Sequence, residues 1–121
     1  MSEEQHATAV IAALSELNAE PYDLDEVPSD ATSYNEVTVS RRVGGQVRGE
    51  SPTTTLMRVT VRAVAKTVSN AREMRRRAQL LEGTTVVVVG VSSTPIQFET
   101  AETIGEDDGW YSGLSTYTYA C

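Results

Sequence analysis

The 121-residue sequence has little of what catalytic and metal sites use, since it contains one cysteine and one histidine. Cys121 cannot form an intrachain disulfide, so nothing ties the chain to an oxidising compartment. One cysteine and one histidine also cannot supply the four ligands of a structural zinc site. His6 falls in the first turn of a predicted helix, where we expect an exposed side chain. These shortages predict a protein that is not an enzyme and that uses no catalytic residue, cofactor or metal.

Long hydrophobic runs are missing as well. Apolar stretches such as Val86 to Val89 are far short of the roughly 20 residues that a membrane helix needs. The first five residues are acidic where a secretory signal is positive and then apolar. The content of 40% apolar and 22% charged residues is typical of a globular protein. We therefore expect a soluble protein without membrane contact, made inside the cell and folded as a single domain over residues 1–121.

Positive charge is missing from both ends of the chain. Residues 1–40 contain nine acids and no base, and residues 78–121 contain six acids and no base. All ten bases lie in residues 41–77, with only two acids among them. The net charge of −7 therefore hides a basic middle. A chain of this net charge repels DNA and anionic membranes unless its bases form a concentrated patch.

The first half of the chain predicts one helix and two strands. A capping-box pattern at Ser2 and an apolar residue every three or four positions predict a helix from Glu3 to Asn18. A long ordered loop follows over residues 21–34. Alternating residues then predict strands at Glu36–Val43 and Leu56–Lys66, the second with one core face and one cationic face. The two strands make a hairpin with a long exposed arm at residues 44–55.

The second half predicts a helix and two or three strands. The helix begins after Ser69 or Asn70 and ends at Gly83, in the position of a C′ glycine. The β-branched run Thr85–Val91 predicts a central strand covered on both faces. Further strands are expected at residues 96–101 and, after a turn or short loop at residues 105–109, in a last strand that ends at Tyr119. The fold class is therefore α+β, a two-layer sandwich in which two helices pack on a mostly antiparallel or mixed sheet of four to five strands.

Glycine-rich and acidic clusters occur in the sequence, but they lack the full motifs of phosphate-binding and calcium-binding loops. The glycines at positions 44, 45 and 49 lie inside a predicted hairpin, and no Gly-Lys-Ser/Thr follows, so a flexible arm is favoured over a phosphate loop. The acidic clusters lack the spacing of a calcium loop, so solvated turns are favoured over cation sites. The clusters are Asp23, Asp25, Glu26 and Asp30, and Glu106, Asp107 and Asp108.

The basic middle leaves three options open. Its side chains can pair with acids of the same chain, bind a nucleic-acid backbone as in a regulator, or contact acids of another subunit. The nucleic-acid option lacks aromatic platforms within residues 41–77. Segregated charge favours the third option, because a head-to-tail interface joins two different surfaces. The candidate interface residues are Arg58, Arg62 and Lys66 on a strand face, Arg72, Arg75 and Arg76 on a helix face, and Gly44, Gly45 and Arg48 in the arm.

The order of these segments resembles the tail terminator proteins of long-tailed, siphovirus-like phages. The resemblance covers nearly the whole chain and includes an amphipathic helix, an acidic Pro-containing stretch, two strands that lead into a helix, and a late turn before a final strand. The matching stretches are residues 7–14 (ATAVIAAL), 19–28 (AEPYDLDEVP), 36–39 (EVTV), 57–64 (MRVTVRAV), 70–81, 107–111 (DDGWY) and 115–119 (STYTY).

This resemblance implies a hexameric ring at the head-proximal end of the phage tail, within the virion. One ring face would stack on the last ring of tail tube protein and stop its polymerisation, and the other would dock the head-completion or neck proteins. DNA would pass through the lumen during ejection without specific binding, in agreement with the acidic net charge. Tail tube and head-completion proteins are the nearest alternatives. The residues expected to face the lumen or a partner are Asp23, Asp25, Glu26, Glu106, Asp107 and Asp108.

Overall fold

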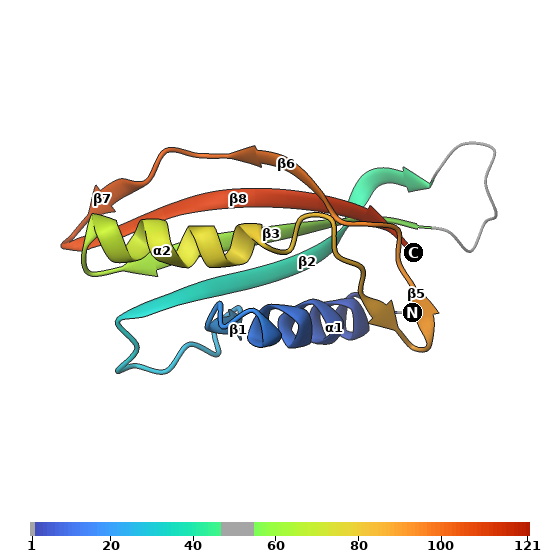
Figure 1. Cartoon of the computed structure of the whole chain (residues 1–121), viewed down its shortest axis with the longest axis horizontal. Coiled ribbons are helices and arrows are strands. Elements are labelled where there is room, and N and C mark those ends of the chain that lie inside the picture. Colours follow the sequence, from blue (N-terminus) through green and yellow to red (C-terminus); the bar gives the residue numbers. More distant parts are fainter. Residues whose placement is uncertain (1, 47–54) are drawn as a thin grey trace.

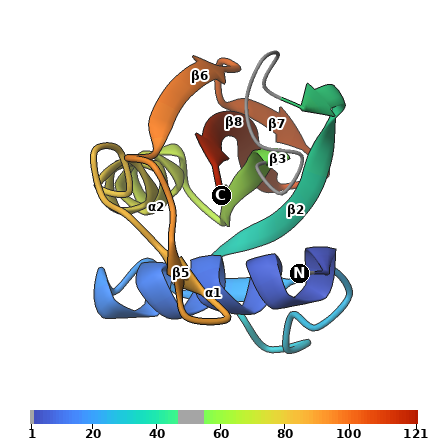
Figure 2. The ribbon, with the colours of Figure 1, turned by 90° about the vertical axis from the view of Figure 1, so that its right-hand side faces the viewer.

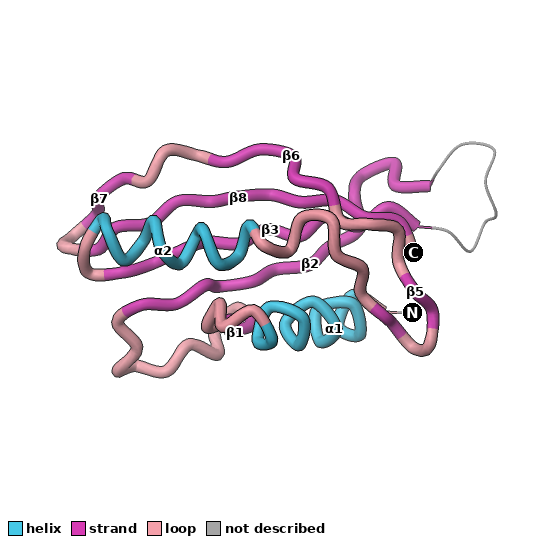
Figure 3. Tube along the Cα trace, in the orientation of Figure 1, coloured by secondary structure: helices cyan, strands magenta, loops and turns pink. Residues whose placement is uncertain are grey.

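The computed structural model describes residues 2–46 and 55–121 and has the expected α+β architecture (Figures 1 and 3). The elements run in the order α1 (Glu3–Glu16), β1 (Pro21–Asp23), β2 (Ser33–Gln46), β3 (Thr55–Ala65), α2 (Val68–Gln79), β4 (Val87–Val88), β5 (Val91–Ser92), β6 (Gln97–Ala101), β7 (Gly105–Asp107) and β8 (Trp110–Ala120). The predicted class and the predicted order of helices and strands are confirmed.

The main sheet has six strands, in the order β1-β2-β3-β8-β6, with β7 also paired to β8. All pairings are antiparallel except that of β1 with β2. The three long strands form its centre, with Val39 opposite Val59 and Val59 opposite Tyr117. Two short edge strands that the sequence prediction did not count, β1 and β7, bring the number of strands to six.

Both helices lie on one side of this curled sheet, as Figure 2 shows. Alternate residues of the long strands point to the helices and are buried, including Val37, Val59 and Tyr117. From α1, Val10 and Leu14 pack into the same cluster, and from the end of α2 so does Ala78. The opposite face of the sheet is open and polar. Neither helix in the described residues is long and apolar enough to cross a bilayer.

The first helix begins as predicted and ends slightly earlier. The Ser2 side chain accepts a hydrogen bond from the Gln5 backbone, and the Gln5 side chain accepts one from the Ser2 backbone, which completes the capping box. The helix ends at Glu16 rather than Asn18. The segment expected to be a loop up to Tyr34 contributes β1 and the first residues of β2.

The boundaries of the second helix differ from the prediction at both ends. Its N-cap is Thr67, whose hydroxyl accepts a hydrogen bond from the Asn70 backbone, and not Ser69 or Asn70. The helix ends at Gln79, four residues before the expected C′ glycine at Gly83. Gly83 instead has a φ of +83° and donates its backbone N–H to the Ile96 carbonyl, so it closes the base of the next hairpin. The buried stripe of Ala71, Met74, Ala78 and Leu81 is confirmed.

The prediction of a central strand at Thr85–Val91 is wrong. The segment forms the small hairpin β4–β5, outside the main sheet, and alternates between buried and exposed residues. Val86 and Val88 are buried, whereas Val87 is 59% exposed and Val89 is 65% exposed. An uninterrupted β-branched run does not distinguish a strand covered on both faces from one covered only on one, because no polar residue marks the outer face.

The turn of this hairpin contains a strained residue. Val88 pairs with Val91, so Val89 and Gly90 form the two-residue turn, with φ values of +49° and +78°. A turn with two positive φ values is of type I′ and favours Asn-Gly. A β-branched residue in this region is a steric outlier that costs roughly 1–2 kcal/mol.

We expect Val89→Asn to raise the free energy of unfolding by about 1 kcal/mol, because asparagine tolerates positive φ. Urea unfolding followed by circular dichroism measures the change. Val91→Asn is the matched control, because Val91 is exposed but lies in a strand. A Val89→Asn variant that is no more stable than the Val91→Asn variant would contradict the strain.

Candidate functional site

The three predicted arginines of α2 line one groove. Arg72, Arg76 and Gln79 form the helix wall of the groove, and Arg75 reaches from the same helix towards the sheet. The other wall is Thr103 and Ile104, in the connection between β6 and β7, and the groove has a volume of about 290 Å³. Arg72 is exposed and makes no ion pair with any residue in the described part of the chain. The groove therefore offers a cationic surface with at least one uncommitted charge.

Arg75 forms the floor of the groove and fixes the helix to the sheet. Its Nη2 donates to the Leu114 carbonyl of β8 at 3.3 Å. The guanidinium lies against Gly113, where the Cβ of any other residue would collide with it and would come within 3.3 Å of the Ile104 backbone. Gly113 thus leaves the space that the arginine fills. The Arg75 Nε is buried without a hydrogen-bond partner among the described atoms.

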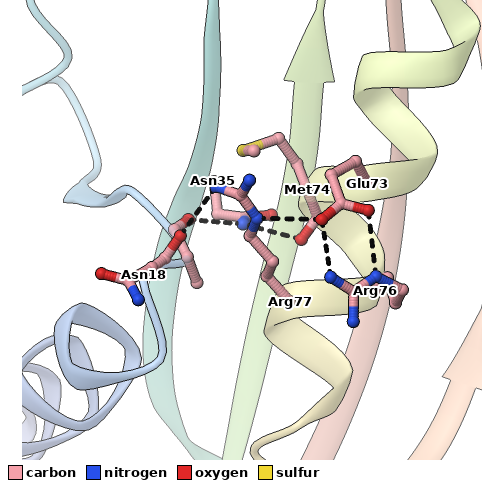
Figure 4. A network of polar contacts seen from close by, with 7 residues as sticks. Asn18, Asn35, Glu73, Met74, Arg76 and Arg77 are labelled. Atoms are coloured by element: carbon pink, nitrogen blue, oxygen red, sulfur yellow. Dashed lines mark hydrogen bonds and ion pairs between the residues drawn. The ribbon is translucent and has the colours of Figure 1, made fainter.

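Glu73 holds the next two arginines in place, as Figure 4 shows. Arg76 donates to its carboxylate from Nε at 2.9 Å and from Nη2 at 2.6 Å, and Arg77 donates from Nε at 3.1 Å. Hydrogen bonds from Arg76 and then Arg77 lower the pKa of Glu73 to about 2. Arg77 also donates to the Asn18 carbonyl at 3.1 Å, which links α2 to the end of α1.

The strand cations lie on the opposite side of the sheet from this groove and are engaged within the chain. Arg58 pairs with Glu99 of β6 at 3.2 Å, and Arg62 donates to the Ser112 hydroxyl at 3.3 Å. The Lys66 ammonium lies 3.8 Å from the centre of the Trp110 ring. The structure therefore splits the six predicted cations into two surfaces: it brings the helix trio together and separates it from the strand trio.

The other predicted residues do not join either surface. Gly44 and Gly45 lie in the β2 backbone, and Arg48 and residues 47–54 of the predicted arm lie outside the described residues. Asp23 accepts a hydrogen bond from the Leu24 backbone, in the exposed turn that contains Asp25 and Glu26. Glu106, Asp107 and Asp108 are exposed at the β7–β8 hairpin. These two acidic clusters follow strands at different edges of the sheet. Within the described ranges, no three acidic, His or Cys residues are grouped to hold a metal ion.

His6 is buried and not exposed, which contradicts the sequence-based expectation. Only 3% of the residue is accessible, and its Nδ1 lies 2.7 Å from the Tyr119 hydroxyl. Burial lowers the pKa of His6 below its usual value of 6.5 and raises the pKa of Tyr119 above its usual value of 10.0. This hydrogen bond ties the start of α1 to the end of β8, and its buried position is typical of a structural histidine.

Two solved structures have the same fold over nearly the whole chain. One, which carries no descriptive name, is 15% identical with a TM-score of 0.62, covering 99% of this chain and 95% of that chain. The other is a chain in the virion of a native gene transfer agent particle. It is 16% identical with a TM-score of 0.61, covering 97% of this chain and 88% of that chain. No family model matches the sequence, and no curated protein matches it.

Sequence reasoning missed the residues whose partners are distant along the chain. Gly113 and Arg75 are 38 positions apart, and nothing near Gly113 marks it as the place where a guanidinium rests. Trp110 supplies an aromatic partner for Lys66 from outside the basic segment, where none was expected. The turn expected at residues 105–109 is present at Asp108 and Gly109, which both have positive φ, but the short strand β7 before it was not predicted.

We expect Gly113→Ala to lower the free energy of unfolding by about 1–3 kcal/mol, because the new methyl group displaces the Arg75 guanidinium and crowds Ile104. The cost should be smaller in an Arg75→Ala background, so the two changes should be less than additive in a double-mutant cycle. Gly105→Ala is the control, because a Cβ there meets nothing within 4 Å. Strict additivity would contradict the proposed contact.

Acid should weaken α2 through Glu73. Because the folded pKa of about 2 lies below the usual 4.5, the carboxylate stabilises the fold above pH 4.5, and this contribution is lost as the pH falls towards 2. Glu73→Gln should therefore lose less stability than the wild type between pH 5 and about 2. Urea midpoints across that range measure it, with Glu82→Gln as an exposed control. Parallel losses in the wild type and the Glu73→Gln variant would exclude this role.

Proposed function

We propose that the protein is a structural virion protein of the tail terminator type, which forms a ring at the head-proximal end of a phage tail. The fold shared with a chain of a gene transfer agent virion, over 97% of this chain, is the observation that carries the proposal. The ring would cap the tail tube, stop its polymerisation and join the tail to the head-completion or neck proteins. Six copies in the ring, with DNA passing through the lumen, follow from the resemblance of the sequence to tail terminators.

The arrangement of charge supports contact between subunits. The groove of Arg72, Arg75 and Arg76 lies on one side of the sheet, and the acidic clusters lie on exposed turns elsewhere. A surface of one sign on one copy can then meet a surface of the other sign on the next copy, which is the requirement of a head-to-tail ring. We propose no catalytic role, and the acidic net charge suits a lumen through which DNA slides.

The alternative of a nucleic-acid-binding regulator receives less support. It needs the strand cations free, whereas Arg58 is paired with Glu99 and Arg62 is bonded to Ser112. Lys66 is likewise occupied by Trp110. Binding to duplex DNA at low salt that weakens steeply as salt is added, and that is lost in Arg58→Ala/Arg62→Ala, would favour this alternative.

Ring formation is tested with Arg72→Glu. This change reverses the uncommitted charge of the groove and should raise the dissociation constant of the assembly by about tenfold or more, with unchanged stability. Size-exclusion chromatography with light scattering measures assembly, and negative-stain imaging with tail tubes shows whether tube ends are capped. Arg42→Glu, on an exposed position of β2, is the control with the same change of charge.

The two parts of the proposal fail in different ways. A wild-type protein that stays monomeric and never caps tube ends would overturn the terminator function. An Arg72→Glu variant that assembles like the Arg42→Glu control would leave the ring in place and remove the α2 groove from its interface.

A further inference from the structure

The β4–β5 hairpin is an apolar element without cover in the monomer. Its three exposed valines are Val87, Val89 and Val91, which are 59%, 65% and 45% exposed. They belong to residues 83–98, which with sixteen positions form the longest stretch of the chain without Asp, Glu, Lys or Arg. Val91 is paired with the buried Val88 and Val87 with Ser92, so Val87 and Val91 lie on opposite faces of the hairpin, and the exposed apolar side chains surround its tip. Apolar side chains gathered at an uncharged tip indicate a surface that another molecule covers.

The hairpin carries no charged residue in either strand and no proline. Natural edge strands avoid pairing with other chains by being short or by carrying charges, prolines or bulges, and β4 and β5 rely on their length of two residues each. Val89 occupies the tip with a φ of +49°, although asparagine or glycine would fit there without strain. An apolar side chain kept at a strained and exposed tip is explained by a contact that the side chain makes elsewhere.

A groove with an apolar wall lies at the other end of the same segment. Where the Gly83 N–H binds the Ile96 carbonyl at the base of the hairpin, there is a shallow groove of about 480 Å³. Its apolar wall includes Phe98, which is 41% exposed at the edge strand β6. The groove is lined by Glu82, Gly83, Pro95, Ile96, Gln97 and Phe98, so a single charge borders it.

From this geometry we infer that the Val89 tip of one copy docks into the Gly83–Phe98 groove of a second copy. The occupant is a second copy because the chain itself carries both the exposed apolar tip and a groove lined by Ile96 and Phe98. Both surfaces are almost free of charge, so the net charge of −7 on each copy opposes this contact little. The tip and the groove are different surfaces, so the contact repeats from copy to copy, as a ring requires. This inference rests on the proposed function. It adds an apolar contact between neighbouring subunits of the proposed ring to the charged contact of the α2 groove.

The double variant Val87→Thr/Val89→Asn tests the docking without weakening the subunit. Threonine keeps a β-branched side chain in β4, and asparagine relieves the tip, so the urea midpoint should not fall. The dissociation constant of the assembly should rise at least about tenfold for each valine removed from the contact. Sedimentation velocity across a concentration series measures it. Thr85→Asn, at an exposed position near the base of the hairpin and outside the tip, serves as the control.

Disulfide trapping tests the partner surface directly. In a Cys121→Ser background, Val89→Cys/Gln97→Cys should give a ladder of covalent oligomers on oxidation, because each copy carries one tip and one groove. Val89→Cys alone has one cysteine per copy, so it can give at most a dimer, and it should stay monomeric on oxidation because the tips do not meet each other. A covalent dimer in the single variant, or no ladder in the double variant, would overturn tip-to-groove docking.

The outcomes separate this inference from the proposed function. Wild-type assembly that is lost in the double valine variant supports both. Assembly that persists in that variant but is lost in Arg72→Glu overturns the docking and leaves the ring. A wild-type protein that is monomeric at every concentration overturns both.

Discussion

The side chain of Asn35 holds both helices on the sheet, and the rest of the structure depends on it. Its Nδ2 donates to the Ala19 carbonyl beyond α1 at 2.7 Å and to the Met74 carbonyl within α2 at 3.0 Å (Figure 4). Its backbone N–H donates to the Glu20 carbonyl at 2.9 Å. Because this residue is fully buried on β2, these bonds form without competition from water. One amide therefore fixes where α1 ends and how α2 lies on the strands.

The position of α2 on the sheet determines where its arginine side chains lie. Its inward residues, Ala71 and Ala78, are small, so the helix lies close to the sheet. Close approach brings Arg75 over Gly113, and the arginine thereby becomes the floor of a groove instead of a solvated surface charge. Glu73 aligns the neighbouring cations from within the same helix. The cationic groove is thus a consequence of core packing as much as of the number of arginines.

The sequence predicted the elements whose signal is local and periodic. Strict alternation placed β3 within one residue of its observed bounds, and the capping box at Ser2 placed the start of α1. Errors arose where distant residues decide the outcome. His6 is buried because Tyr119 lies 113 positions further along the chain and meets it, and the strand trio is engaged because β6 and β8 supply its partners. The candidate site was accordingly half predicted: the helix arginines meet, and the strand cations do not join them.

The error at Thr85–Val91 has a different origin and bears on assembly. A β-branched run without charge indicates that its side chains are shielded from water. It does not indicate whether the same chain or a second copy covers them. In the monomer the alternation of Val86 to Val89 places half of the run outside the core. At physiological salt, charges more than about 8 Å apart are largely screened, so arginines and acids on neighbouring copies act mainly at contact. In the proposed ring, the apolar tip would supply affinity that salt does not screen, and the cationic groove would select the register between neighbouring copies.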